Sequence, residues 1–151
     1  MKEPKRSGPW SSAQVEDYLA NTIIPIRLSA ISEAGWPVVV SMWFLPEQGA
    51  ILCAARKTAK IVEILEHNAR CGFEISGDRP PYFGVRGQAH VTLDRDMGPA
   101  LLVRLINRYL GPEETPFRRW LLQDADDETA IIMHPVRVMS WDYRGRMRTG
   151  A

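Results

Sequence analysis

Short apolar runs rich in β-branched residues, each closed by a turn, dominate this chain of 151 residues. Three such runs come early, at residues 22–31, 36–45 and 50–55. They are too short for core helices and are typical of strands. Residues 36–45 alternate between two mostly apolar faces, which predicts that both faces are covered. Because only short turns separate the three runs, the sequence predicts an antiparallel meander.

Later segments add more strands and a few helices. We expect strands at residues 71–76, 83–93, 130–134 and 136–143, and helices at 13–21, 58–68, 99–110 and 115–122. Ser11 and Gln14 have the spacing of a capping box, and Thr58 is a plausible N-cap. The pattern predicts a mainly β protein with flanking helices (α+β), built as an antiparallel barrel of six to seven strands.

Length and composition indicate one domain, placed at residues 13–147 between a mobile N-terminal arm (1–12) and a tail (148–151). Nineteen Lys and Arg against 18 Asp and Glu give a net charge of +1, which disfavours nucleic-acid binding through bulk charge. No apolar run is long enough to span a bilayer, and the N-terminus is not a signal peptide. Cys53 and Cys71 lie in strand-like runs, as expected for reduced, buried thiols. These features predict a cytoplasmic protein without a membrane partner.

Residues 54–60 are the most informative segment for chemistry. A strand ends there, Arg56, Lys57 and Lys60 follow, Thr58 adds a hydroxyl, and a helix begins. Backbone N–H groups and the positive dipole end of a helix favour an anion, so this turn is a candidate phosphate site. A solvated basic strand end is the alternative. The acidic loop at residues 124–128 is expected to be solvated.

Other side chains give weaker indications. His67, His90 and His134 fit no metal or nucleophile motif, so no metal site is predicted. The five tryptophans are expected in the core, or, for Trp43 and Trp141, beside a planar ligand.

Several of these segments, taken in order, resemble the pyridoxamine 5′-phosphate oxidase-like flavoproteins. The similar stretches are Arg27-Leu28-Ser29-Ala30-Ile31, Gly35-Trp36-Pro37, Val40-Ser41-Met42-Trp43-Phe44, residues 56–65, residues 71–76, Val85-Arg86-Gly87-Gln88-Ala89, and Pro135-Val136-Arg137-Val138 before Trp141-Asp142. The likeness covers about residues 23–147. The substrate-binding Arg and His set of the oxidase that names the family has no clear match, so the resemblance implies a relative of that oxidase.

The resemblance implies an FMN-binding split barrel that forms a homodimer, with the cofactor at the subunit interface. The residues that would line the flavin ring are Arg27, Leu28, Ser29, Ala30, Ser41, Met42 and Trp43, and backbone N–H groups of these strands would bond its polar edge. The phosphate would be held by Arg56, Lys57, Thr58 and Lys60. The partner subunit would contribute Gln88 and Trp141.

The leading hypothesis is an FMN-dependent oxidoreductase that moves electrons between the flavin and a small organic molecule or a nicotinamide. A deazaflavin-dependent reductase is one alternative, for which Lys2, Lys5 and Arg6 could extend a basic groove. A flavin or haem carrier without turnover is another. Catalytic residues are not identified, and Tyr82, Arg86 and His90 are only candidates.

Overall fold

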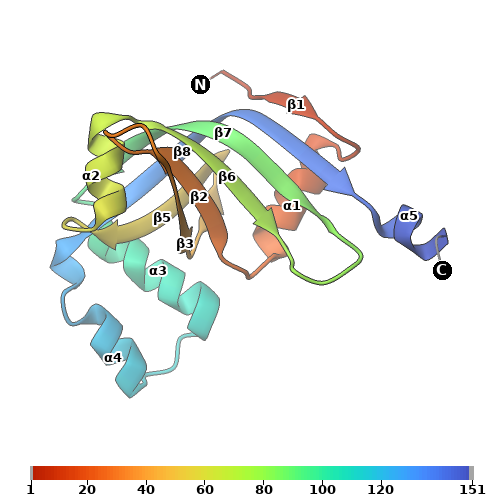
Figure 1. Cartoon of the computed structure of the whole chain (residues 1–151). Helices are drawn as coiled ribbons and strands as arrows, with labels where there is room; N and C mark the ends of the chain where they lie inside the picture. The colour runs from red at the N-terminus through yellow and green to blue at the C-terminus, as the bar shows by residue number, and fades with distance from the viewer. Residues whose placement is uncertain (1, 150–151) are drawn as a thin grey trace.

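The computed structural model describes residues 2–149, and the side chains of that range through residue 146. Its described part is an α+β fold with one mostly antiparallel sheet, as the sequence predicts (Figure 1). The strands are β1 (Lys5–Ser7), β2 (Ile26–Ile31), β3 (Pro37–Met42), β4 (Leu45–Glu47), β5 (Ala50–Arg56), β6 (Arg70–Ser76), β7 (Phe83–Asp94) and β8 (Glu128–Asp142). The helices are α1 (Ser12–Asn21), α2 (Lys60–His67), α3 (Gly98–Leu110), α4 (Pro116–Leu122) and α5 (Arg144–Thr149), with a 3₁₀ turn, η1, at Ala125–Asp127.

Strand order differs from a simple meander. The sheet runs β3-β2-β6-β7-β8-β5-β4, and β1 pairs with β8 in parallel. β5 pairs with β4 and β8 and not with β3, so the predicted three-stranded meander is wrong. The chain turns out of β3 at Phe44, whose side chain has no exposed surface and whose backbone N–H donates to the Tyr109 hydroxyl at 3.1 Å. After this turn, β4 and β5 lie at the opposite end of the sheet from β3.

The last two predicted strands form one long strand, β8. The register between β7 and β8 shifts at Gln88 and Ala89, whose partners are Arg137 and Pro135. Val136 is therefore the extra residue of a β-bulge, which keeps the strand continuous while changing its twist. The described residues hold eight strands in all, more than predicted, because β1 and β4 have only three residues each and lack an apolar pattern.

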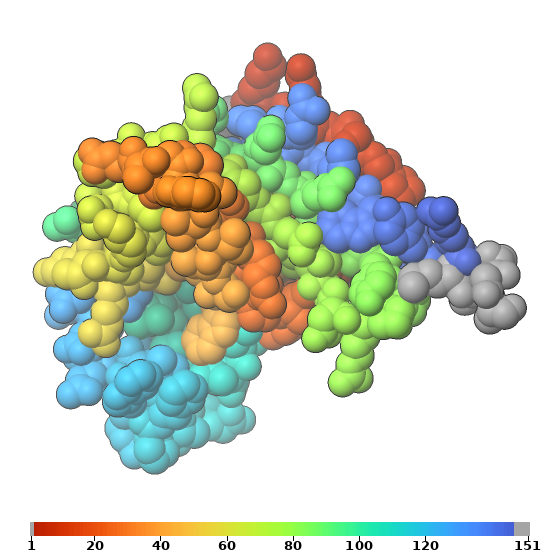
Figure 2. Space-filling model, in the orientation of Figure 1, coloured from red at the N-terminus to blue at the C-terminus, as the bar shows by residue number. Residues whose placement is uncertain are grey.

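Side-chain alternation separates an inner face from an outer one. On β2, Ile26, Leu28 and Ala30 are buried while Arg27 is exposed. β3 alternates in the same way and Val39 is 65% exposed, so the expectation that both faces of this strand are covered is wrong within one chain. Apolar residues of α2 join the main core, and α3 covers a second cluster beside β5 and β8. Figure 2 shows α3 and α4 as a lobe at one end of the molecule, where α3 packs against β5 and β8.

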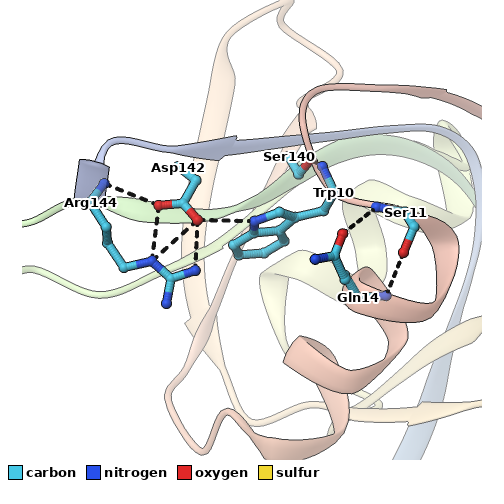
Figure 3. Close-up of polar contacts among 6 residues, drawn as sticks. All are labelled: Trp10, Ser11, Gln14, Ser140, Asp142 and Arg144. Atoms are coloured by element: carbon cyan, nitrogen blue, oxygen red, sulfur yellow. Dashed lines mark hydrogen bonds and ion pairs between the residues drawn. The ribbon is translucent and has the colours of Figure 1, made fainter. Parts of the chain in front are cut away.

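The N-terminal segment, predicted to be a mobile arm, is paired with the sheet. β1 lies along β8, and Ser11 and Gln14 then form the predicted capping box of α1. Between them, the Trp10 indole Nε1 donates to Asp142 Oδ2 at 3.1 Å, and the Trp10 backbone N–H donates to Ser140 Oγ at 3.1 Å (Figure 3). The segment before α1 is thus bonded to the end of β8.

The C-terminal tail begins at this same place. Arg144 donates to both oxygens of Asp142, at distances from 2.6 to 3.2 Å (Figure 3). These bonds, with a further one from the Trp10 indole, hold the pKa of the Asp142 carboxyl well below its ordinary value. No helix among residues 2–149 is long and apolar enough to cross a membrane.

Candidate functional site

The outer face of the sheet gathers polar side chains from four strands. Residues that are register partners across β2, β6, β7 and β8 form rows on this face. One row consists of Arg27, Glu74, Arg86 and Met139, and the neighbouring row consists of Ser29, Gly72, Gln88 and Arg137. Direct neighbours in such rows lie close enough for their side chains to interact. The sheet therefore brings together Arg27, Ser29 and Gln88, three of the predicted site residues. The resemblance implied that Gln88 approaches from the partner subunit, whereas here it lies in the same row as Ser29 of its own chain.

These rows line a groove of about 570 Å³, the size of a small-molecule site. Three arginines and one carboxylate face it: Arg27, Arg86 and Arg137 against Glu74. Gly72 lies in the middle of its floor, where an added Cβ would meet only ordinary contacts, at 3.7 Å or more. The floor is therefore flat and open, with an excess of positive charge around it.

Trp141 lies next to this groove. The Arg86 guanidinium sits over its ring, 5.5 Å from the centroid, and also donates to Met139 Sδ at 3.1 and 3.3 Å. Arg86 is thus oriented by two neighbours on β8. Glu74 is oriented by the Ser76 hydroxyl, which donates to it at 3.0 Å.

The remaining residues predicted to line the ring divide between the two faces of the sheet. Ser41 is exposed and is the register partner of Arg27, so it borders the groove. Leu28 and Ala30 are 0% and 1% exposed, and Met42 packs against the same core. Their side chains therefore face the barrel interior.

Backbone contacts from β2 are also restricted. β2 pairs with β3 on one side and β6 on the other, so its N–H groups serve two ladders. β3 is the edge strand of the sheet, with one side of its backbone unpaired within the chain. Unpaired backbone N–H groups at this end of the sheet thus belong to β3 and not to β2.

Trp43, expected in the core or beside a planar ligand, packs in the core. It stacks on Tyr109 of α3, with ring centroids 5.0 Å apart and planes 10° from parallel. It also packs with the second apolar cluster. The aromatic wall beside the groove is therefore Trp141, while Trp43 serves the contact with α3. Trp36 and Trp120, expected in the core, are 74% and 62% exposed.

The basic turn forms a separate cluster that does not line the groove. Arg56 pairs with Asp124 at 3.3 Å, Lys57 with Asp127 at 3.0 Å, and Lys60 with Glu63 at 3.2 Å. The acidic loop, expected to be solvated, thus neutralises two of these cations. Its role could not be read from sequence, because 67 or more positions separate the partners along the chain.

The start of α2 differs by two residues from the prediction. Ala59, not Thr58, is the N-cap, and no side chain caps the helix. The first backbone N–H groups of α2 are therefore left to solvent or to an anion. Thr58 is exposed immediately before them. This arrangement suits a phosphate, since surface ion pairs of this kind contribute little and exchange readily.

The other candidates are less well placed for chemistry. Arg86 lies in the groove, whereas Tyr82 is 43% exposed in the loop before β7. His90 and His134 are register partners one row beyond Gln88, and His67 lies on α2. Within the described residues no group of three or more His, Cys, Asp or Glu could hold a metal ion.

The strand order and the flanking helices define the class of this fold, a split β-barrel. No protein-family model matches the chain, and no curated protein matches it. Solved structures do match, and they are pyridoxamine 5′-phosphate oxidase-like split-barrel proteins, in agreement with the resemblance in sequence.

Three structural neighbours are similar over most of their length. The conserved hypothetical protein Rv2991 from Mycobacterium tuberculosis has a TM-score of 0.78 and 19% identity, over 97% of this chain and 93% of that one. An F420 reductase has a TM-score of 0.69 and 20% identity, over 81% and 94%. A protein from Listeria innocua, provisionally named as a pyridoxamine 5′-phosphate oxidase, has a TM-score of 0.65 and 14% identity, over 85% and 95%. At these identities the likeness establishes the fold.

Proposed function

We propose that the outer groove binds a flavin-type coenzyme and that the protein is an FMN-dependent oxidoreductase acting on a small organic molecule. The observation that carries the proposal is the groove itself, with its open floor at Gly72 and three arginines around one carboxylate. A planar ring needs such a flat floor, and a flavin gains negative charge on reduction, which nearby guanidinium groups stabilise. Neighbours with the same fold include an F420 reductase and a FAD-binding protein from Mesorhizobium loti.

A bound flavin supplies hydride or electron transfer at its central ring. Arg27 and Arg86 would hold negative charge at the ring, and the Gln88 amide would bond a polar ring edge. Arg56, Thr58 and Lys60, with the uncapped start of α2, would hold the phosphate. Lys57 is less available for the phosphate because two of its groups bind Asp127. Its backbone N–H donates to the Asp127 carbonyl at 2.8 Å, and its ammonium pairs with the Asp127 carboxylate.

A second copy of the chain would complete the site. Val39 borders the groove and is 65% exposed, and Trp36, at the turn before β3, is 74% exposed. Apolar surface of this kind beside a ligand groove favours burial by a partner. Homodimerisation thus belongs to the proposal, and a cytoplasmic location remains a prediction.

The test is a titration of the purified protein with FMN, followed by flavin fluorescence and the visible spectrum. Lys60→Ala should weaken binding about tenfold or more, because a charge-assisted bond to phosphate is lost. Arg119→Ala is the matched control, since Arg119 pairs with Glu114 on the α4 lobe. Gly72→Leu should abolish binding by filling the groove, whereas Gly77→Leu, where an added Cβ meets nothing within 4 Å, should not. Absence of flavin binding by the wild type would refute the proposal.

A deazaflavin coenzyme is the second candidate, and one contact favours it. Lys5 of β1 is the register partner of Arg137, so it extends the row of Gln88 and Arg137. A longer anionic tail could follow this basic row. Arg6 does not contribute, because it is the partner of the inward-facing Val138. Affinities for the two coenzymes, measured with wild type and Lys5→Gln, distinguish the candidates.

A further inference from the structure

A second cavity lies on the inner side of the sheet, away from the outer groove. It has a volume of about 560 Å³ and is bounded by β1, α1 and the turn between β4 and β5. Its floor is apolar and is formed by Val15, Ile51, Phe73, Val85 and Val138, each at most 6% exposed. In Figure 1, α1 lies behind β7, on the side away from β2 and β3. A cavity of this size, with such a floor, can hold the apolar body of a small molecule.

One cation is directed at this floor. Arg6 is the register partner of Val138, so its side chain points inward and lines the cavity. That side chain keeps 28% of its accessible surface. Its ion pair with Glu3 is long, 4.0 Å, and the Glu3 side chain is 89% exposed, so the pair contributes little. A guanidinium has five N–H donors in a planar fork suited to a carboxylate.

The other charges of the cavity stand at its exposed rim. Glu47 accepts from Arg104 at 2.7 Å and is thereby neutralised. Lys2 and Glu16, of opposite sign, also line the rim and are exposed. Arg6 is therefore the charge that an anionic group above the apolar floor would meet.

We propose that this inner cavity binds a small organic carboxylate with an apolar body, such as a medium-chain alkanoate. The carboxylate pairs with Arg6, and the chain lies on Phe73, Val85 and Val138. The site lies on the face of the sheet opposite to Arg86 and Arg137, so the proposal does not depend on flavin binding.

Isothermal titration of the full-length protein with octanoate and with octanamide tests the charge. Octanoate should bind about tenfold or more tightly than octanamide, since the amide cannot form a charge-assisted pair. Arg6→Gln should remove this preference. Lys5→Gln is the matched control, because it removes a cation from the same strand on the opposite face. If Lys5→Gln or Arg86→Gln loses octanoate binding while Arg6→Gln keeps it, the ligand lies on the outer face and the proposal is overturned.

The apolar floor is tested by chain length and by obstruction. Affinity should rise about fourfold for each methylene added from butanoate until the cavity is filled. Ala20 lines the cavity from α1, while Ala13, on the same helix, does not, and both are exposed. Ala20→Trp should therefore block octanoate, and Ala13→Trp should leave it unchanged, with circular dichroism verifying that both fold. Wild-type protein that binds none of the alkanoates, or equal effects of the two tryptophans, would overturn the proposal.

Discussion

Arg108 of α3 ties this helix to the end of α1. Its Nη2 donates to the carbonyls of Leu19 at 2.8 Å and Thr22 at 3.0 Å, and its Nη1 donates to that of Ala20 at 3.1 Å. The guanidinium also lies over the Phe44 ring, 5.1 Å from the centroid. The last carbonyls of a helix have no partner within it, so Arg108 acts as the C-terminal cap of α1.

The substitution Arg108→Met keeps an unbranched chain against Phe44 and removes the donors. The two partly buried bonds, to Leu19 and Thr22, contribute about 1.5 kcal/mol each, and the exposed bond to Ala20 is replaced by water at little cost. The substitution also removes the buried Nε of Arg108, which has no hydrogen-bond partner in the described chain, and this offsets about 1 kcal/mol of the loss in stability. The expected loss is therefore about 2 kcal/mol, or about 4–8 °C in Tm.

Urea unfolding at 25 °C measures this loss. Arg104→Met is the matched control, one turn earlier on α3, where the partner is Glu47 and both side chains are more than 40% exposed. That substitution should change the free energy of unfolding by less than about 1 kcal/mol. In Arg108→Met the amides of α1 should also exchange with solvent faster than those of α3. Equal losses in the two variants would refute the capping role.

Two further predictions concern acid stability and close packing. The pKa of Asp142 is depressed in the folded state, so the ionised carboxylate stabilises the fold. This stabilisation is full above the unfolded pKa of about 3.9 and is lost as the pH falls below that value. In urea unfolding, the free energy of unfolding should therefore fall less between pH 6 and pH 2.5 in Asp142→Asn than in wild type. Equal falls in the two proteins would count against the Arg144 contact. At Gly98 an added Cβ would lie 1.9 Å from the Glu128 carbonyl oxygen, so Gly98→Ala should destabilise by about 1–3 kcal/mol. Gly77→Ala, in open space, is its control, and similar urea midpoints for the two would contradict this reasoning.

Local features of the fold could be predicted because local chemistry determines them. The capping box at Ser11 is confirmed, and α3 spans almost the predicted residues, since an apolar stripe and Gly111 define it. The strand expected at residues 83–93 is also confirmed as β7. Thr58 was misjudged as an N-cap because any hydroxyl residue near a helix start fits that pattern.

The candidate site was predictable only in part. Arg27, Arg86 and Gln88 could be named, but the neighbouring rows that bring them together depend on the pairing of β2, β6 and β7. Arg137 and Glu74 were missed as groove residues, because an isolated charge on a strand gives no indication of its neighbours across the sheet. The core expectation for Trp43 is confirmed, but its stacking partner, Tyr109, could not be named because it is 66 positions away.

The sequence alone determined most of the element types and the basic turn at Arg56 to Lys60. Periodicity, caps and turn residues act over a few positions, so they can be read along the chain. Only the tertiary structure decided that β5 joins β8, that Val136 forms a bulge and that the acidic loop neutralises the basic turn. Those outcomes depend on which distant segments bury each other's surfaces, and local sequence patterns do not contain that information.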